Sequence, residues 1–299
     1  MEATRSEPFT LDVPGGRTLA GVLHLPAGEP GPRPAVVICH GFKGFMDWGF
    51  FPHLAELLAA RGFAAVRFNL SGAGVRPGED RVSDPEAFRA DTYSREVEEL
   101  EAVLGALGGE VGGDRVAGGP IGLVGHSRGG AVALLAAAGE RFRGRIGALV
   151  TWAAIGEADR FSAEQKEAWR RDGELEVINA RTGQRLAIGL DLLRDLEENR
   201  DALDLPAAAG RRTAPWLIVH GEADETVAAT EAERLHAAAT PPAELLVLAG
   251  LGAGHTFGAV HPFAGPTPEL IQAMNATQRW LRRRLVFRGA SLPGSRARH

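Results

Sequence analysis

The sequence predicts an α/β protein built on a mainly parallel, doubly wound sheet of about eight strands. Short apolar segments rich in β-branched residues alternate with longer segments of helical periodicity. Several of the short segments are apolar at every position, as in strands that helices cover on both faces. Repeated strand–helix units of this kind form parallel sheets with right-handed crossovers. We expect one such domain over residues 1–285 of the 299.

The predicted elements follow one another in a regular order. A leading hairpin pairs a strand from Phe9 to Val13 with one from Thr18 to Leu25, across a Pro-Gly-Gly turn at 14–16. The later strands are expected at 35–39, 64–70, 121–125, 146–154, 215–220 and 244–249, and the helices between and after them at 50–61, 86–106, 128–139, 229–238 and 267–285.

One stretch, about 157–212, interrupts this alternation. It contains charged helical segments near 162–171 and 190–203, with a hairpin-like segment at 176–188 between them. Because it lies between two core strands and has little continuous apolar sequence, we interpret it as an insertion that forms a small lid. Residues 286–299, rich in Arg, Gly, Ser and Pro, are expected to be a flexible tail.

Composition excludes several classes of function. The net charge of −5 and the pI near 6.0 give no basis for binding nucleic acid or an anionic membrane, and the arginines at 282–284 suit the carbonyl end of the last helix. Cys39 is the only cysteine, so an intramolecular disulfide and a thiolate metal cage are excluded. The N-terminus has no apolar signal core and no run of ~18 apolar residues occurs, so we expect no membrane span and a cytoplasmic location.

No cofactor or metal is expected. The glycines at 72, 74 and 78 follow a strand and resemble a dinucleotide-binding loop only weakly, because Pro77 and Gly78 stand where a phosphate-binding helix should begin. P-loop, HExxH and paired-cysteine motifs are absent from the sequence.

The strongest motif is Gly125-His126-Ser127-Arg128-Gly129, between a buried strand and an alanine-rich helix. A serine on such a sharp turn is raised above the sheet at the amino end of a helix, where N–H groups favour developing negative charge. Crowding around the turn requires glycine two residues before and two residues after the serine. Ser127 is therefore the candidate nucleophile.

A serine hydroxyl needs a histidine as general base, and the histidine needs a carboxylate to orient it. Asp224 follows the strand 215–220, and His255 follows the strand 244–249 in a glycine-rich loop. Both fall at the carboxyl ends of strands, where open α/β sheets place their sites. The remaining alternatives are His261 for the base, and Glu222 or Glu225 for the carboxylate.

Two backbone N–H groups are needed to stabilise the tetrahedral oxyanion. One is expected from Arg128, directly after the nucleophile. The other is expected from the glycine-rich loop 40–44, from Phe42 or, as the second choice, Lys43.

With these motifs in order, residues 9–285 resemble the α/β-hydrolase superfamily. The stretch 40–49, HGFKGFMDWG, and the compact insertion are similar to bacterial serine esterases of the dienelactone-hydrolase-like and feruloyl-esterase-like groups. True dienelactone hydrolases have a cysteine nucleophile, whereas this chain has Ser127. The resemblance implies an α/β-hydrolase fold and an acyl-enzyme mechanism.

The substrate pocket is the least determined part of the prediction. Phe45 and Trp48 from one side, and Phe161, Trp169 and Leu192 from the insertion, are candidate lining residues, with packing in the core as the alternative for each. The expected activity is hydrolysis of a small-molecule carboxylic ester. An acyl-aminopeptidase, a thioesterase, an acyltransferase or a non-catalytic binding protein are the alternatives, and a homodimer is allowed.

Overall fold

The computed structural model describes residues 3–28, 31–250 and 252–286. Its main feature is an eight-stranded sheet in the order β1-β2-β4-β3-β5-β6-β9-β10, with β1 and β2 antiparallel and the other strands parallel to one another. The strands are β1 (Thr4–Val13), β2 (Arg17–Pro26), β3 (Ala35–Cys39), β4 (Ala64–Phe68), β5 (Ile121–His126), β6 (Ile146–Trp152), β9 (Trp216–Gly221) and β10 (Ala243–Leu248). The predicted fold class is confirmed.

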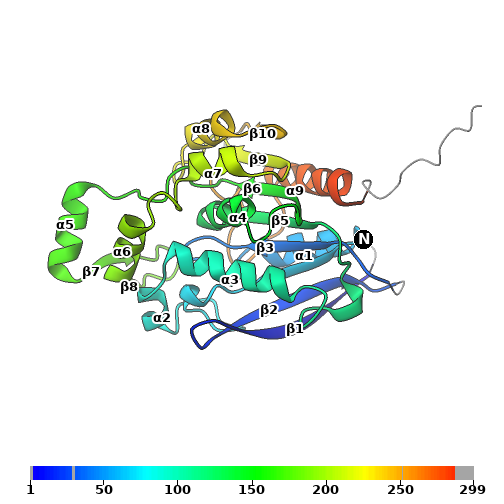
Figure 1. Ribbon diagram of the computed structural model, residues 1–299, viewed down its shortest axis with the longest axis horizontal. Helices are drawn as coiled ribbons and strands as arrows, with labels where there is room; N and C mark the ends of the chain where they lie inside the picture. Colours follow the sequence, from blue (N-terminus) through cyan, green and yellow to red (C-terminus); the bar gives the residue numbers. More distant parts are fainter. Residues whose placement is uncertain (1–2, 29–30, 251, 287–299) are drawn as a thin grey trace, which may run out of the picture.

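Helices cover both faces of this sheet (Figure 1). One face packs against α3 (Tyr93–Ala106), α4 (Arg128–Ala138), α7 (Leu205–Arg211) and α8 (Ala229–Ala238). The other face packs against α1 (Phe51–Ala59) and α9 (Pro268–Leu281). Every residue of β3, β5, β6 and β9 is buried, which explains why these strands are apolar without alternation.

The insertion lies beyond one end of the sheet (Figure 1). The part beyond the sheet consists of α5 (Ala163–Asp172), a separate two-stranded sheet of β7 (Glu174–Ile178) and β8 (Arg185–Gly189), and α6 (Leu190–Glu198). The helix α7 also falls within the predicted insertion 157–212, but its apolar residues pack on the face of the main sheet instead. The Ser94 N–H, on α3, donates to the Asp195 carboxylate on α6 at 3.0 Å. The Lys43 ammonium donates to the Ile178 carbonyl at 3.2 Å. These contacts place the insertion against the loops that follow the strands.

Two predicted helices differ in the structure. The helix expected over 86–106 is two helices, α2 (Pro85–Arg89) and α3, because Thr92 starts a new helix by accepting the Arg95 N–H. The helix expected over 190–203 ends at Glu198, and α7 then begins at a separate cap where Asp204 accepts the Ala207 N–H. The two caps, not the apolar periodicity, determine where these helices begin.

The C-terminal end of the chain differs in detail. α9 ends at Leu281, and residues Arg282–Val286 form a wider π-helical turn in place of the predicted continuation. The predicted tail lies outside the described residues from 287 onward. No helix in the described part of the chain is long and apolar enough to cross a membrane.

Candidate active site

Ser127 lies on a strained turn between β5 and α4. Its φ of 56° and ψ of −125° are unusual for a residue with a side chain. A Cβ at Gly125 would lie 2.3 Å from the Gly129 carbonyl oxygen, and a Cβ at Gly129 would lie 2.1 Å from the His40 carbonyl oxygen. The turn can therefore form only with glycine at these two positions, as the motif requires.

His255 lies within hydrogen-bond distance of this serine. Its Nε2 is 3.0 Å from Ser127 Oγ, and its Nδ1 is 2.8 Å from Asp224 Oδ2. The loops that hold the two partners are joined, because the Ala223 N–H donates to the Ala253 carbonyl at 3.1 Å. The structure thus brings together the three side chains that the sequence analysis selected.

Asp224 is fully buried and surrounded by hydrogen-bond donors. Besides His255, the N–H groups of Thr226 and Val227 donate to Oδ1 at 2.9 Å each, and His220 Nε2 lies 3.3 Å from Oδ2. Burial alone would raise the pKa of Asp224, but the hydrogen bonds from His220, His255 and Val227 outweigh it and hold the pKa below its usual value. Asp224 is therefore ionised and can orient a proton on His255 Nδ1.

The alternative residues occupy other positions. His261 Nδ1 accepts the Gly49 N–H at 3.0 Å, and its ring packs near Phe45 and Trp48. Glu222 and Glu225 are exposed. Of the described carboxylates, only Asp224 forms a hydrogen bond with His255.

His126 was not selected from the sequence as part of the site, yet it supports His255. Its Nε2 donates to the His255 carbonyl at 2.9 Å. Burial, reinforced by the His255 charge, lowers the pKa of His126 to about 3, so the ring remains neutral and acts as a donor. His126 therefore holds the backbone of the candidate general base.

The predicted oxyanion donors belong to backbone segments that meet at Ser127. A Cβ at Gly41 would lie 2.9 Å from Ser127 Cβ and 3.4 Å from the Arg128 nitrogen, so the loop 40–44 passes directly over the turn. Neither the Phe42 N–H nor the Arg128 N–H donates a hydrogen bond to a backbone carbonyl of the described residues. Lys43, the second choice, has a φ of 58° and its side chain reaches the insertion.

Two side chains, those of His40 and Asn69, hold the loop 40–44 and the residues after it in place. His40 Nε2 accepts the Leu70 N–H at 3.2 Å, and Asn69 Oδ1 accepts the Met46 N–H at 2.7 Å. Burial lowers the pKa of His40 to about 4, which keeps Nε2 free to accept. The loop is thereby held at a fixed distance from the nucleophile.

The Arg128 side chain is buried in a charged cluster that the sequence analysis did not find. Its guanidinium lies 2.9 Å from Asp91 Oδ2 and 2.8 Å from Glu96 Oε2, and it stacks on the Tyr93 ring at 4.1 Å. Burial raises the pKa of Glu96 well above its usual value, and the same cause raises that of Asp91. The only signal in the sequence was a charged residue inside an otherwise apolar helix, which requires a buried partner.

Two cavities meet at Ser127 and Phe42. The first, about 150 Å³, is also lined by Lys43, Trp48, Phe51, His126, His255 and Thr256. The second, about 180 Å³, is lined by residues of α3, the start of α4, the loops after β6 and β9, and the insertion, among them Tyr93, Ile155, Phe161, Ile188, Leu192 and Val227.

Three of the five predicted lining residues line one of these cavities, and the other two do not. Trp48 lines the first cavity, and Phe161 and Leu192 line the second. Phe45 and Trp169 line neither cavity and are almost fully buried. Trp169 supports Phe161 from behind at a ring distance of 5.1 Å and donates to the Ile188 carbonyl.

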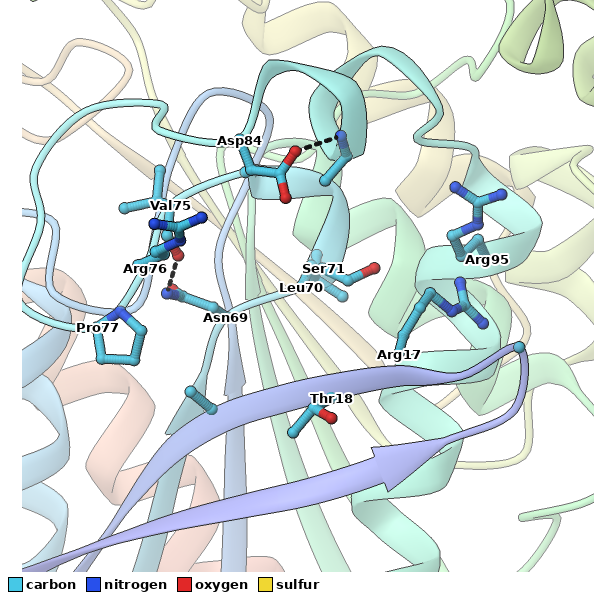
Figure 2. A pocket seen from close by; sticks show the side chains of 14 residues that line it. Arg17, Thr18, Asn69, Leu70, Ser71, Val75, Arg76, Pro77, Asp84 and Arg95 are labelled. Carbon is cyan, nitrogen blue, oxygen red and sulfur yellow. Dashed lines mark hydrogen bonds between the residues drawn. The ribbon is translucent and has the colours of Figure 1, made fainter.

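A larger hollow of about 500 Å³ lies over β2 and the segment 69–77 (Figure 2). Arg17 and Arg95 lie on one side of it and Arg76 on the other (Figure 2). None of its lining residues lines the two cavities at Ser127. The glycine-rich segment that resembled a dinucleotide loop contributes to its wall, and the next helix begins only at Pro85.

Among the described residues, no group of three or more His, Cys, Asp or Glu side chains is arranged to hold a metal ion.

The fold and the loops at the carboxyl ends of its strands define the class of α/β hydrolases. The chain belongs to the alpha/beta hydrolase family, whose model matches residues 36–273. The predicted resemblance is thereby confirmed at the level of the superfamily, with esterases among the structural neighbours.

Solved structures support the same fold. Est1E from Butyrivibrio proteoclasticus with bound ferulic acid is 23% identical, with a TM-score of 0.64 over 92% of this chain and 98% of that one. The esterase domain of a Rhodothermus marinus protein is 20% identical, with a TM-score of 0.61 over 93% and 98%. The α/β hydrolase GrgF from Penicillium sp. sh18 is 20% identical, with a TM-score of 0.67 over 95% and 100%. No curated protein matches the sequence.

Proposed function

We propose that this hydrolase is a serine esterase that cleaves small-molecule carboxylic esters through an acyl-enzyme intermediate. The observation that carries the proposal is the continuous hydrogen-bonded chain from Asp224 through His255 to Ser127 Oγ, with distances of 2.8 and 3.0 Å. These are the distances at which an imidazole can remove a serine proton.

The steps follow from this geometry. His255 Nε2 takes the hydroxyl proton as Ser127 Oγ attacks the ester carbonyl, and the Phe42 and Arg128 N–H groups stabilise the oxyanion. The protonated His255 then donates the same proton to the leaving alcohol oxygen. In the second half, His255 takes a proton from water, the hydroxide attacks the acyl carbonyl, and the acid leaves as Ser127 regains its proton.

Ser127→Ala tests the nucleophile. We expect kcat for ester hydrolysis to fall by about 10⁴-fold or more, because the attacking oxygen is removed while the fold remains intact. Ser162→Ala, at an exposed helix start in the insertion, serves as the control. A fluorophosphonate should label the wild-type protein at Ser127 alone, and retention of hydrolysis in Ser127→Ala would contradict the assignment.

A panel of p-nitrophenyl esters, compared with aminoacyl-nitroanilides, tests the bond type. Faster cleavage of amides than of esters would replace the esterase by an acyl-aminopeptidase. The cytoplasmic location and the homodimer stay predictions from the sequence.

A further inference from the structure

The two cavities at Ser127 can be assigned to the two halves of an ester, on the basis of the proposed esterase mechanism. The leaving oxygen must receive its proton from His255 Nε2, so the alcohol part has to lie on the histidine side. His255 and Thr256 line the 150 Å³ cavity and do not line the 180 Å³ cavity. The acyl group therefore occupies the 180 Å³ cavity.

The size and lining of this cavity limit the acyl group. A cavity of ~150 Å³ lined by apolar side chains accommodates benzene, and the volume here is about 180 Å³. Most of its lining residues are apolar, among them Phe42, Ile155, Phe161, Leu192 and Val227. An acyl group of about one six-membered ring fits these dimensions.

The charges in the wall are already paired within the protein. Arg128 is neutralised by Asp91 and Glu96. Arg160 forms two hydrogen bonds with Glu231, at 2.7 and 2.6 Å. Since both guanidinium groups have partners, the cavity offers no uncompensated cation for an anionic acyl group.

One hydroxyl group in the wall has no hydrogen-bond partner among the described residues. The residue Tyr93 is 5% exposed and lines the cavity, and its hydroxyl forms no hydrogen bond with any residue that the structure describes. The hydroxyl oxygen is not fully enclosed by protein, so water in the cavity can reach it. Burial raises the pKa of Tyr93 to about 12, so the phenol keeps its proton and remains a donor. Thr226, the other hydroxyl residue of the wall besides Ser127, is exposed at the rim.

An acyl group that fills this cavity expels the water that can otherwise accept from Tyr93. If the acyl group were wholly apolar, a buried donor would be left without a partner, which is costly. We infer that the acyl group of the substrate carries a neutral oxygen that accepts a hydrogen bond from Tyr93, on a portion of about one ring in size. Tyr93 is then a specificity-determining residue for the acid half of the ester.

A matched set of acyl groups on one leaving group tests this inference. 4-Nitrophenyl phenylacetate is compared with its 2-, 3- and 4-hydroxy derivatives, with the 4-methyl derivative as an apolar match and the 4-carboxy derivative as a charged one. We expect kcat/KM for at least one hydroxylated ester to exceed that of the parent by roughly 2- to 10-fold, the range for one net hydrogen bond. The methyl derivative should gain no such advantage, and the carboxylate should be the poorest substrate.

Tyr93→Phe should abolish this preference, so that the ratio of kcat/KM between the best hydroxylated ester and the parent falls to about 1. The variant keeps the ring that stacks on Arg128, and the ratio cancels any loss shared by all esters. Ser94→Ala removes the neighbouring hydroxyl, which donates to Asp195 instead of facing the cavity, and should retain the preference.

A spectroscopic measurement gives a second readout, because Tyr93 is the only tyrosine in the chain. In Ser127→Ala labelled with ¹³Cζ-tyrosine, the single resonance should shift more with the preferred hydroxylated ester than with the parent. This inference is overturned if the enzyme hydrolyses the esters without preferring a hydroxylated acyl group, or if the preference persists in Tyr93→Phe. Either result leaves the proposed esterase activity unaffected. A lack of hydrolysis with every ester, including the parent, overturns both.

Discussion

Two groups of buried carboxylates lie near Ser127, and their pKa values are shifted in opposite directions. Asp224, after β9, faces two histidines and two backbone N–H groups, and its pKa is lowered. Asp91 and Glu96, at the start of α3, share the single guanidinium of Arg128, and their pKa values are raised. Burial opposes ionisation in both groups, so the number and kind of donors decides the outcome.

The opposite pKa shifts of Asp224 and of the Asp91–Glu96 group match the chemistry proposed next to each. A negative charge on Asp224 stabilises the positive charge that forms on His255. The Arg128 backbone, in contrast, faces the position where negative charge develops on the substrate. The raised pKa of Glu96 favours its neutral form, which reduces the net negative charge of the cluster behind the oxyanion position.

Among substitutions of these buried carboxylates, Asp224→Asn should have the largest effect on catalysis. The amide preserves the shape but no longer favours the Nδ1–H tautomer of His255, and we expect kcat to fall by about 10³- to 10⁴-fold with little change in KM. Glu222→Gln and Glu225→Gln, at the exposed neighbours, provide matched controls. A comparable loss in either control, with Asp224→Asn active, would move the role of the carboxylate to that neighbour.

The sequence alone was sufficient to predict the strands, the turn at Ser127 and the places of Asp224 and His255, because each depends on a short local pattern or on chain order. The buried strands follow from apolar runs, and the turn at Ser127 follows from glycines that steric contact requires at 125 and 129. The positions of Asp224 and His255 follow from chain order in this fold, because each needs only a place after a given strand.

The parts that the sequence did not reveal depend on contacts between distant segments. Asp91 and Glu96 are ordinary acidic residues of a helical segment until Arg128, more than 30 positions away, is seen between them. His126 looked like a residue of the motif alone, but it holds the backbone of His255. Trp169 is an aromatic residue of the insertion and is therefore a reasonable candidate for the pocket wall, but it packs behind Phe161 instead.

Replacing Arg128, the cation between Asp91 and Glu96, should lower the free energy of unfolding more than replacing one residue of a surface ion pair. Arg128→Met leaves Asp91 and Glu96 buried without their partner, so we expect the free energy of unfolding to fall by about 3–5 kcal/mol. Urea unfolding at pH 7 measures this. Arg141→Met, which removes a largely exposed arginine from its ion pair with Glu101, should cost less than about 1 kcal/mol. Equal losses in the two variants would show that the buried cluster contributes no more than a surface pair.

Glu96→Gln tests the raised pKa of Glu96 through a smaller, pH-dependent effect on stability. Because the pKa is higher in the folded protein than in the unfolded chain, the folded protein binds more protons above pH ~4.5. The stabilising contribution of Glu96 is therefore complete below this pH and is lost as the pH rises towards the folded pKa.

The free energy of unfolding of Glu96→Gln minus that of the wild type should thus increase from pH 5 to pH 8, by at most about 1.4 kcal/mol per pH unit. Glu98→Gln, at an exposed position of the same helix, controls for the loss of a surface charge. A difference that stays constant over this range would mean that Glu96 is ionised in the folded protein. The cluster behind Arg128 would then carry two negative charges and one positive charge, and the contrast with Asp224 would no longer hold.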